Sequence, residues 1–212
     1  MKKTVILIVV LLIASISGKS TAQEKSGGMS FVSMHTGAFF PSISGFKDVY
    51  HSPCAFINGI SLGTNFINQN TFFYLKAMYF QKSGTPITYH INYNNETGEV
   101  TKWTTQEGTC TYKQLICNAG VQYNIKFRLS NILFLNGGIA LVKQSEKIKN
   151  SASANNGKGM PCYFFGIGYE KCVLEKISLF SEFQYNFDWK ILNILGLKYG
   201  GANINIGFRY YF

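Results

Sequence analysis

The chain has 212 residues, of which only 14% are Asp, Glu, Lys or Arg, whereas soluble globular proteins carry about 25%. Its aromatic content of 16%, with 18 Phe and 13 Tyr, excludes a disordered chain and is unlike that of a typical cytosolic enzyme. The mean hydropathy is only +0.04, and no apolar run reaches the ~18 residues that a membrane-spanning helix needs. These values favour strands that are apolar on one face and polar on the other.

The N-terminus has the pattern of a signal peptide. Two lysines precede an apolar run that begins at Val5, and a small-residue stretch ends at Ala22 without a nearby Cys. We therefore expect a signal peptide over residues 1–22, a short spacer over 23–28 and a single β-barrel domain over 29–212.

Loss of the three leader lysines lowers the formal net charge from +10 to +7, with 17 Lys and Arg left against 10 Asp and Glu. An exported basic protein rarely meets nucleic acid, so no nucleic-acid partner is expected, and lipid phosphates are the expected acidic neighbours. The odd number of cysteines means that at least one is free and leaves room for a disulfide. No metal site or cofactor is expected, because zinc-type spacing is absent from the five cysteines Cys54, Cys110, Cys117, Cys162 and Cys172.

After the spacer, polar and apolar residues alternate with period two, which is the pattern of half-buried strands. In the last segment, for example, polar Asn205 and Arg209 share one face while Ile206 and Phe208 share the other. Each segment matches the ~9 to 11 residues of a tilted strand that crosses a bilayer. The expected strands are 29–40, 54–66, 71–82, 109–125, 131–144, 160–173, 177–188 and 201–212.

The connections between these segments alternate between short and long, as they do at the two ends of a membrane barrel. A β-sandwich is the alternative, but its strands average nearer 5 to 6 residues and its ends do not sort the loops so regularly. We therefore predict an all-β, eight-stranded antiparallel up-and-down transmembrane β-barrel with both termini in the periplasm. The short connections are 67–70, 126–130 and 174–176, and the long ones are 41–53, 83–108, 145–159 and 189–200.

Two stretches carry a family resemblance. The segment FFYLKAMYFQKSG and the ending Asn205-x-Gly207-x-x-Tyr210-x-Phe212 resemble those of small outer-membrane β-barrels of the OmpX/OmpA-like type, particularly the PorT-related branch in Gram-negative bacteria. Lys76 stands where that family usually has an acidic residue. The resemblance implies an outer-membrane location and a C-terminal signal that is recognised by the barrel-assembly machinery. As an alternative function, it implies an accessory role in protein secretion.

Four charged residues have the parity of the barrel interior: Lys76, Glu170, Glu182 and Arg209. An eight-stranded barrel is about wide enough for its own side chains, and buried charges persist only when they are paired. We expect a polar network that fills the lumen; the alternative is a narrow ion path.

Catalysis is not expected. Ser33 and His35 are the one pair worth testing as a hydrolase site, but residues two apart on a strand lie about 6 to 7 Å from each other. No acidic residue is evidently placed to orient the imidazole, and His51 and His90 lie in predicted loops.

Two surface features suggest partners. Residues 85–107 continue the alternation around a turn, so we expect a hairpin that binds an envelope or host protein by strand addition, or else a stiff loop without a partner. A lysine cluster is expected to contact lipopolysaccharide phosphates, with solvated loop lysines as the alternative; it comprises Lys143, Lys147, Lys149 and Lys158.

The expected function is that of a non-enzymatic outer-membrane protein whose surface loops act in adhesion, envelope integrity or host contact. The alternatives are an accessory component of a protein-secretion apparatus, a narrow channel and a lipid-modifying enzyme, because a fold alone does not choose among them.

Overall fold

In the structure, a computed structural model, the described residues are 29–43, 45–93, 100–106, 108–128, 130–149, 154–156, 159–188 and 200–212. The expected signal peptide and spacer lie outside them. The elements are β1 (Ser30–Pro41), α2 (Phe46–Tyr50), β2 (Ala55–Asn65), β3 (Thr71–Gly84), β4 (Ile87–Tyr93), β5 (Val100–Gln106), β6 (Cys110–Arg128), β7 (Asn131–Ile148), β8 (Ala154–Asn156), β9 (Met160–Leu174), β10 (Ile177–Asp188) and β11 (Gly201–Tyr211).

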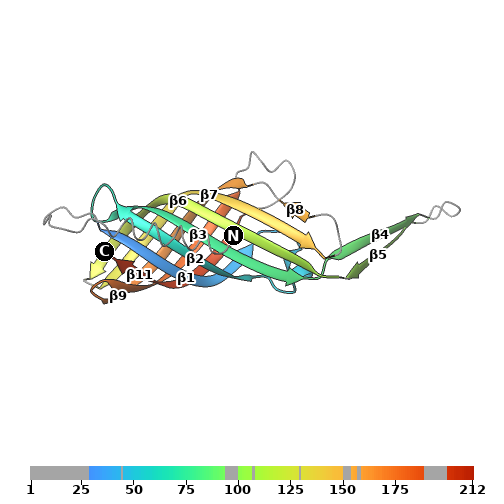
Figure 1. Cartoon of the computed structure of the whole chain (residues 1–212), viewed down its shortest axis with the longest axis horizontal. Helices are drawn as coiled ribbons and strands as arrows, with labels where there is room; N and C mark the ends of the chain where they lie inside the picture. The colour runs from blue at the N-terminus through green and yellow to red at the C-terminus, as the bar shows by residue number, and fades with distance from the viewer. Residues whose placement is uncertain are drawn as a thin grey trace.

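The described strands form a closed barrel. Eight of them pair antiparallel in the order β1, β2, β3, β6, β7, β9, β10 and β11, and β11 returns to β1 through a register that runs from Phe31↔Tyr211 to Pro41↔Gly201. Figure 1 shows these strands winding obliquely around one axis. The prediction of an all-β, eight-stranded antiparallel up-and-down barrel is therefore confirmed.

The two ends of the barrel differ. At one end, here called the turn end, the barrel strands are joined by short connections, and the backbone of Ser30 bonds that of Phe212 next to them. The opposite end, here called the loop end, carries the long connections, which include α2, β4, β5 and β8. The loop asymmetry expected from the sequence is present.

The sheet extends further toward the loop end than the sequence suggested. β7 continues to Ile148 rather than stopping near residue 144, because its last residues stay paired with β6 up to Cys110↔Ile148. β8 then pairs with the same stretch through Ser145↔Asn156. Part of the expected 145–159 loop is therefore sheet. The backbone stays paired beyond residue 144, where the alternation of apolar and polar residues ends.

The period-two geometry of the strands sorts side chains between two environments. Outward positions of the barrel carry large apolar side chains such as Phe165 and Ile206, which are 52% and 61% exposed. Inward positions are buried, and several are glycines because bulky neighbours take their space. A Cβ on Gly168, for example, would lie 2.1 Å from the Phe134 ring.

Aromatic side chains and α2 close the loop end of the interior. Rings of Phe39 and Phe80 lie 5.0 Å apart, and Phe80 and Tyr112 lie 5.6 Å apart. Above them, Phe46 of α2 packs on Tyr112 at 5.7 Å. The chain can turn across the mouth here because Gly45 has a φ of 75° in the left-handed region.

A second sheet stands apart from the barrel. β4 and β5 pair only with each other in the described structure, from Ile87↔Gln106 to Tyr93↔Val100. Figure 1 shows this ribbon projecting beyond the barrel, away from the end that carries the C-terminus.

Within the described part of the chain, no helix is long and apolar enough to cross a membrane.

Candidate functional sites

The four inward charges form two ion pairs inside the barrel. Lys76 on β3 bonds Glu182 on β10 across the lumen, since these strands are not neighbours in the sheet. Arg209 on β11 bonds Glu170 on β9, with Nη1 and Oε2 2.5 Å apart. The side chains of all four are at most 4% exposed, so each charge depends on protein partners instead of water.

Amides complete the shell around the first pair. Asn136 Nδ2 donates to Glu182 Oε1 at 2.6 Å, and Asn205 Nδ2 donates to Oε2 at 3.3 Å. Lys76 Nζ also donates to Gln184 Oε1 at 3.1 Å. The Lys76–Glu182 pair thus links strands from opposite sides of the barrel through fully buried hydrogen bonds.

The second pair is held among aromatic rings. Tyr211 donates its phenol proton to Glu170 Oε1 at 2.6 Å, and Arg209 Nη2 donates to Gln122 Oε1 at 3.2 Å. The Arg209 guanidinium lies 4.0 Å from the centroid of the Phe31 ring. Phe134 and Phe180 approach the same group at 5.1 Å each, so ring faces replace part of its lost hydration.

The structure does not assemble a hydrolase site from Ser33 and His35. The Ser33 hydroxyl bonds that of Ser61 on the adjacent strand. Both imidazole nitrogens of His35 are buried and without a hydrogen-bond partner among the described residues, and the ring lies 6.3 Å from that of Phe180. The serine and the histidine therefore do not activate each other here.

The cysteines do not form a site. All five are free thiols, with Cys110 and Cys162 buried in the interior and Cys117 on the outer surface. In the ranges that the structure describes, no three His, Cys, Asp or Glu side chains gather as metal ligands would. The room that the sequence left for a disulfide is not used in this structure.

The lysine cluster lies at the loop end. Lys143 and Lys147 are exposed on the outer face of β7, and Lys149 is exposed just beyond the strand, whereas Lys158 lies outside the described residues. The structure adds Lys113, exposed on β6 opposite Ser145 and therefore diagonal to Lys143 and Lys147.

The neighbouring carboxylate, Glu146, lies on the opposite face of β7 from Lys143 and Lys147. Glu146 accepts a hydrogen bond of 2.6 Å from Tyr50 of α2. Burial and this contact raise the pKa of the Tyr50 phenol, which stays a neutral donor. On the outer face, the exposed side chains of Leu115 on β6 and Leu141 on β7 lie next to these lysines. The lysines, here called the basic patch (Lys113, Lys143, Lys147 and Lys149), therefore begin where the apolar outer surface of the barrel, here called the apolar band, ends.

The C-terminal residues divide between the inside and the outside of the barrel. Asn205 is buried inside the barrel, where Gly207 leaves room beside His35. Tyr210 and Phe212 are 40% and 42% exposed on the outside, and their rings stack 6.3 Å apart. The outward pair therefore faces the medium that surrounds the barrel.

No protein-family model matches the sequence, and a comparison with curated proteins finds no match. Among solved structures, neisserial surface protein A has a TM-score of 0.59 at 14% identity, covering 88% of this chain and all of its own. The N-terminal β-barrel domain of Pseudomonas aeruginosa OprF has 0.49 at 13%, covering 86% and 97%. Ail, the attachment invasion locus protein of Yersinia pestis, solved with the heparin analogue sucrose octasulfate, has 0.48 at 11%, covering 88% and 100%.

The closed antiparallel sheet, its apolar exterior and its filled interior define the class: a small eight-stranded β-barrel of the outer-membrane type. Within that class, the fold is similar to that of neisserial surface protein A over the full length of the latter.

Proposed function

We propose that this chain is a non-enzymatic protein of the bacterial outer membrane that acts through its loop end in adhesion, envelope integrity or host contact. In this proposal, residues 1–22 direct export, the Phe212 ending is recognised by the barrel-assembly machinery, and the turn end faces the periplasm. The observation that carries it is the β4–β5 ribbon, a two-stranded sheet outside the barrel.

The ribbon has the geometry of a strand-addition site. Its two strands of seven residues each bond one another, and neither bonds a further strand in the described chain. Each therefore keeps an outer row of backbone donors and acceptors. An extended segment of an envelope or host protein can pair with such an edge through main-chain hydrogen bonds.

The test replaces residues 87–106 with a short turn and compares partners that co-purify from gently solubilised outer membranes. We expect normal barrel assembly with loss of bound protein and of cell attachment. The matched control replaces 154–156 at the same end with Gly and Ser, and should keep the partners. Unchanged partners after removal of the ribbon would refute this assignment.

The basic patch supplies a second contact, with lipopolysaccharide phosphates. Lys113, Lys143, Lys147 and Lys149 follow directly on the apolar band, where lipid phosphates lie, and each such lysine contributes about 1 kcal/mol. Four Lys→Gln changes should weaken lipopolysaccharide binding by up to about a thousandfold. Lys176→Gln, at the turn end, is the control and should leave binding unchanged.

The resemblance to the PorT-related branch supports one alternative, an accessory component of a secretion apparatus. The same ribbon would then bind an envelope protein, and its removal would stop secretion as well as co-purification. A narrow channel has less support, because paired charges and aromatic side chains fill the described interior. A lipid-modifying enzyme has less still, because Ser33 bonds Ser61 rather than His35.

A further inference from the structure

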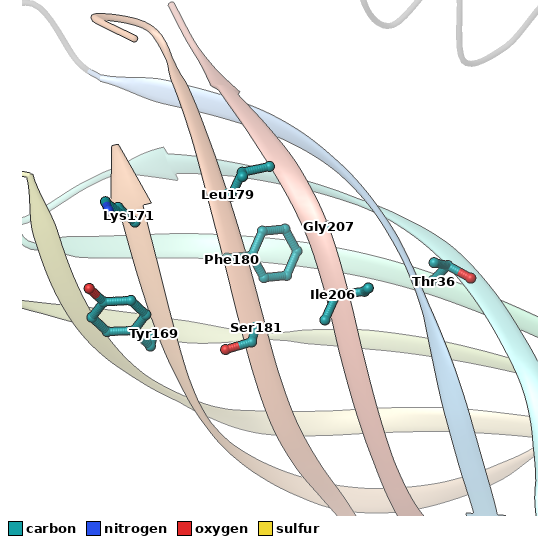
Figure 2. Close-up of a pocket in the computed structure, with 8 residues that line it drawn as sticks. All are labelled: Thr36, Tyr169, Lys171, Leu179, Phe180, Ser181, Ile206 and Gly207. Carbon is teal, nitrogen blue, oxygen red and sulfur yellow. The ribbon is translucent and has the colours of Figure 1, made fainter. Parts of the chain in front are cut away.

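The outer surface of the barrel has a hollow on its lipid-facing side, at Ser181. It has a volume of about 490 Å³ and lies over β9, β10, β11 and β1. Figure 2 shows Tyr169 and Lys171 on one strand, with Leu179 and Ser181 on the next. A second hollow of about 340 Å³ shares Tyr169 and Ser181 with the first, so the two form one depression, here called the Ser181 groove.

The groove exists because a small residue, Ser181, interrupts an otherwise bulky outer face. On β10, Ser181 stands between Leu179 and Phe183, which are 56% and 46% exposed. Tyr169 forms one wall, and its hydroxyl donates to Asn131 at 2.9 Å, which restrains the ring.

Strand register places the groove relative to the ends of the barrel. Lys171 pairs with Asn131, the first residue of β7, and with Leu179, close to the start of β10. Lys171 and its two cross-strand partners therefore lie next to the turn end. Ser181 pairs with Ile206 near the middle of β11, so the groove runs from the turn end toward the middle of the apolar band.

The larger hollow carries one charged side chain, the cation of Lys171. Glu182 lines the smaller hollow, but its carboxylate is buried inside the barrel against Lys76. None of the residues that line the larger hollow is acidic, and Lys171 is exposed. Its neighbour in sequence, Glu170, points inward and bonds Arg209, so it does not offset the charge of the lysine. A lysine near a strand end can extend its ammonium group toward the lipid headgroups.

We propose that the Ser181 groove binds one glycerophospholipid of the leaflet at the turn end. The phosphate lies at Lys171 Nζ, and an acyl chain lies along Leu179, Ser181 and Ile206. A second copy of the chain would present the same basic, apolar face and no anion, so charge complementarity selects the phospholipid.

The test is native mass spectrometry of the mature barrel, purified in mild detergent and mixed with phosphatidylglycerol or phosphatidylethanolamine. Wild type should retain one phospholipid, and diacylglycerol, which lacks the phosphate, should be retained less. Ser181→Phe fills the groove and Lys171→Gln removes the cation. Lys171→Gln should weaken retention by roughly tenfold, the value of one charge-assisted contact. Ser181→Phe should weaken retention because its ring occupies the space of the acyl chain.

Two matched controls should retain the lipid as wild type does: Ala77→Phe, outward on β3, and Lys176→Gln, at the same end but outside the groove. Migration on unheated gels verifies that each variant is folded, and Lys171→Gln carries the test alone if Ser181→Phe does not fold. The proposal is overturned if wild type retains no lipid, if both groove variants retain it fully, or if a dimer replaces the lipid adduct.

Discussion

The replacement Glu182→Gln tests whether the interior is a structural plug. The change keeps the shape of the side chain and removes its charge. Glu182 is 5% exposed and accepts bonds from Lys76, Asn136 and Asn205. After the change, the Lys76 ammonium stays buried without a negative charge beside it. The new amide has one acceptor oxygen left for the three donors that the carboxylate accepts from, and Lys76 also keeps its bond of 3.1 Å to Gln184.

The cost follows from the burial of both partners. Removing one member of a buried ion pair destabilises a protein by about 3 to 5 kcal/mol, because the other charge stays uncompensated. At a urea dependence of about 2 kcal/mol per molar, the unfolding midpoint should fall by roughly 2 M. Adding Lys76→Met to the variant removes both charges and should restore most of this loss.

The assay is urea unfolding of the barrel in lipid vesicles, followed by gel mobility without heating. Glu175→Gln, in the exposed β9–β10 turn, should keep the wild-type midpoint. In planar bilayers the wild type should show little steady conductance. An unchanged midpoint in Glu182→Gln together with stable cation-selective wild-type channels would refute the plug and favour a channel.

Two further predictions concern the C-terminal residues Tyr211 and Phe212. Phe212→Lys should reduce the amount of assembled barrel in the outer membrane, because a charge replaces an outward aromatic in the ending that the assembly machinery recognises; normal accumulation of folded barrel would show that this role of the ending is wrong. Tyr211→Phe removes the 2.6 Å bond to Glu170 and should lower stability by about 1.5 to 3 kcal/mol in the same urea assay. Tyr210→Phe, on the outer face, should lower it far less, and equal effects of the two changes would contradict the arrangement around Glu170.

Period two in the sequence was sufficient to predict which side chains lie inside. A strand exposes alternate residues to opposite faces, and the membrane requires the apolar set outside. The alternation alone therefore predicts that Lys76 and Glu182 point inward, and the structure places both inside the barrel. The resemblance also marked Lys76 as a departure, and its partner proves to be Glu182 on a distant strand.

The pairing itself could not be predicted, because it depends on how far each strand is staggered around the barrel. No local pattern contains that stagger, which brings β3 opposite β10. The same holds for Lys113, whose outward parity was visible although its position diagonal to Lys143 requires the β6–β7 register. The short helix α2 had only a weak signal, the spacing of four between Phe46 and Tyr50, inside a segment assigned as loop.

The central claim, a closed barrel resident in the outer membrane, is tested most directly by fractionating cells and comparing the mature chain on gels before and after boiling. The account predicts recovery with the outer membrane and a different apparent size before heating, because a barrel that closes from β11 to β1 resists detergent. Recovery in the soluble periplasm, with the same size before and after boiling, would contradict it.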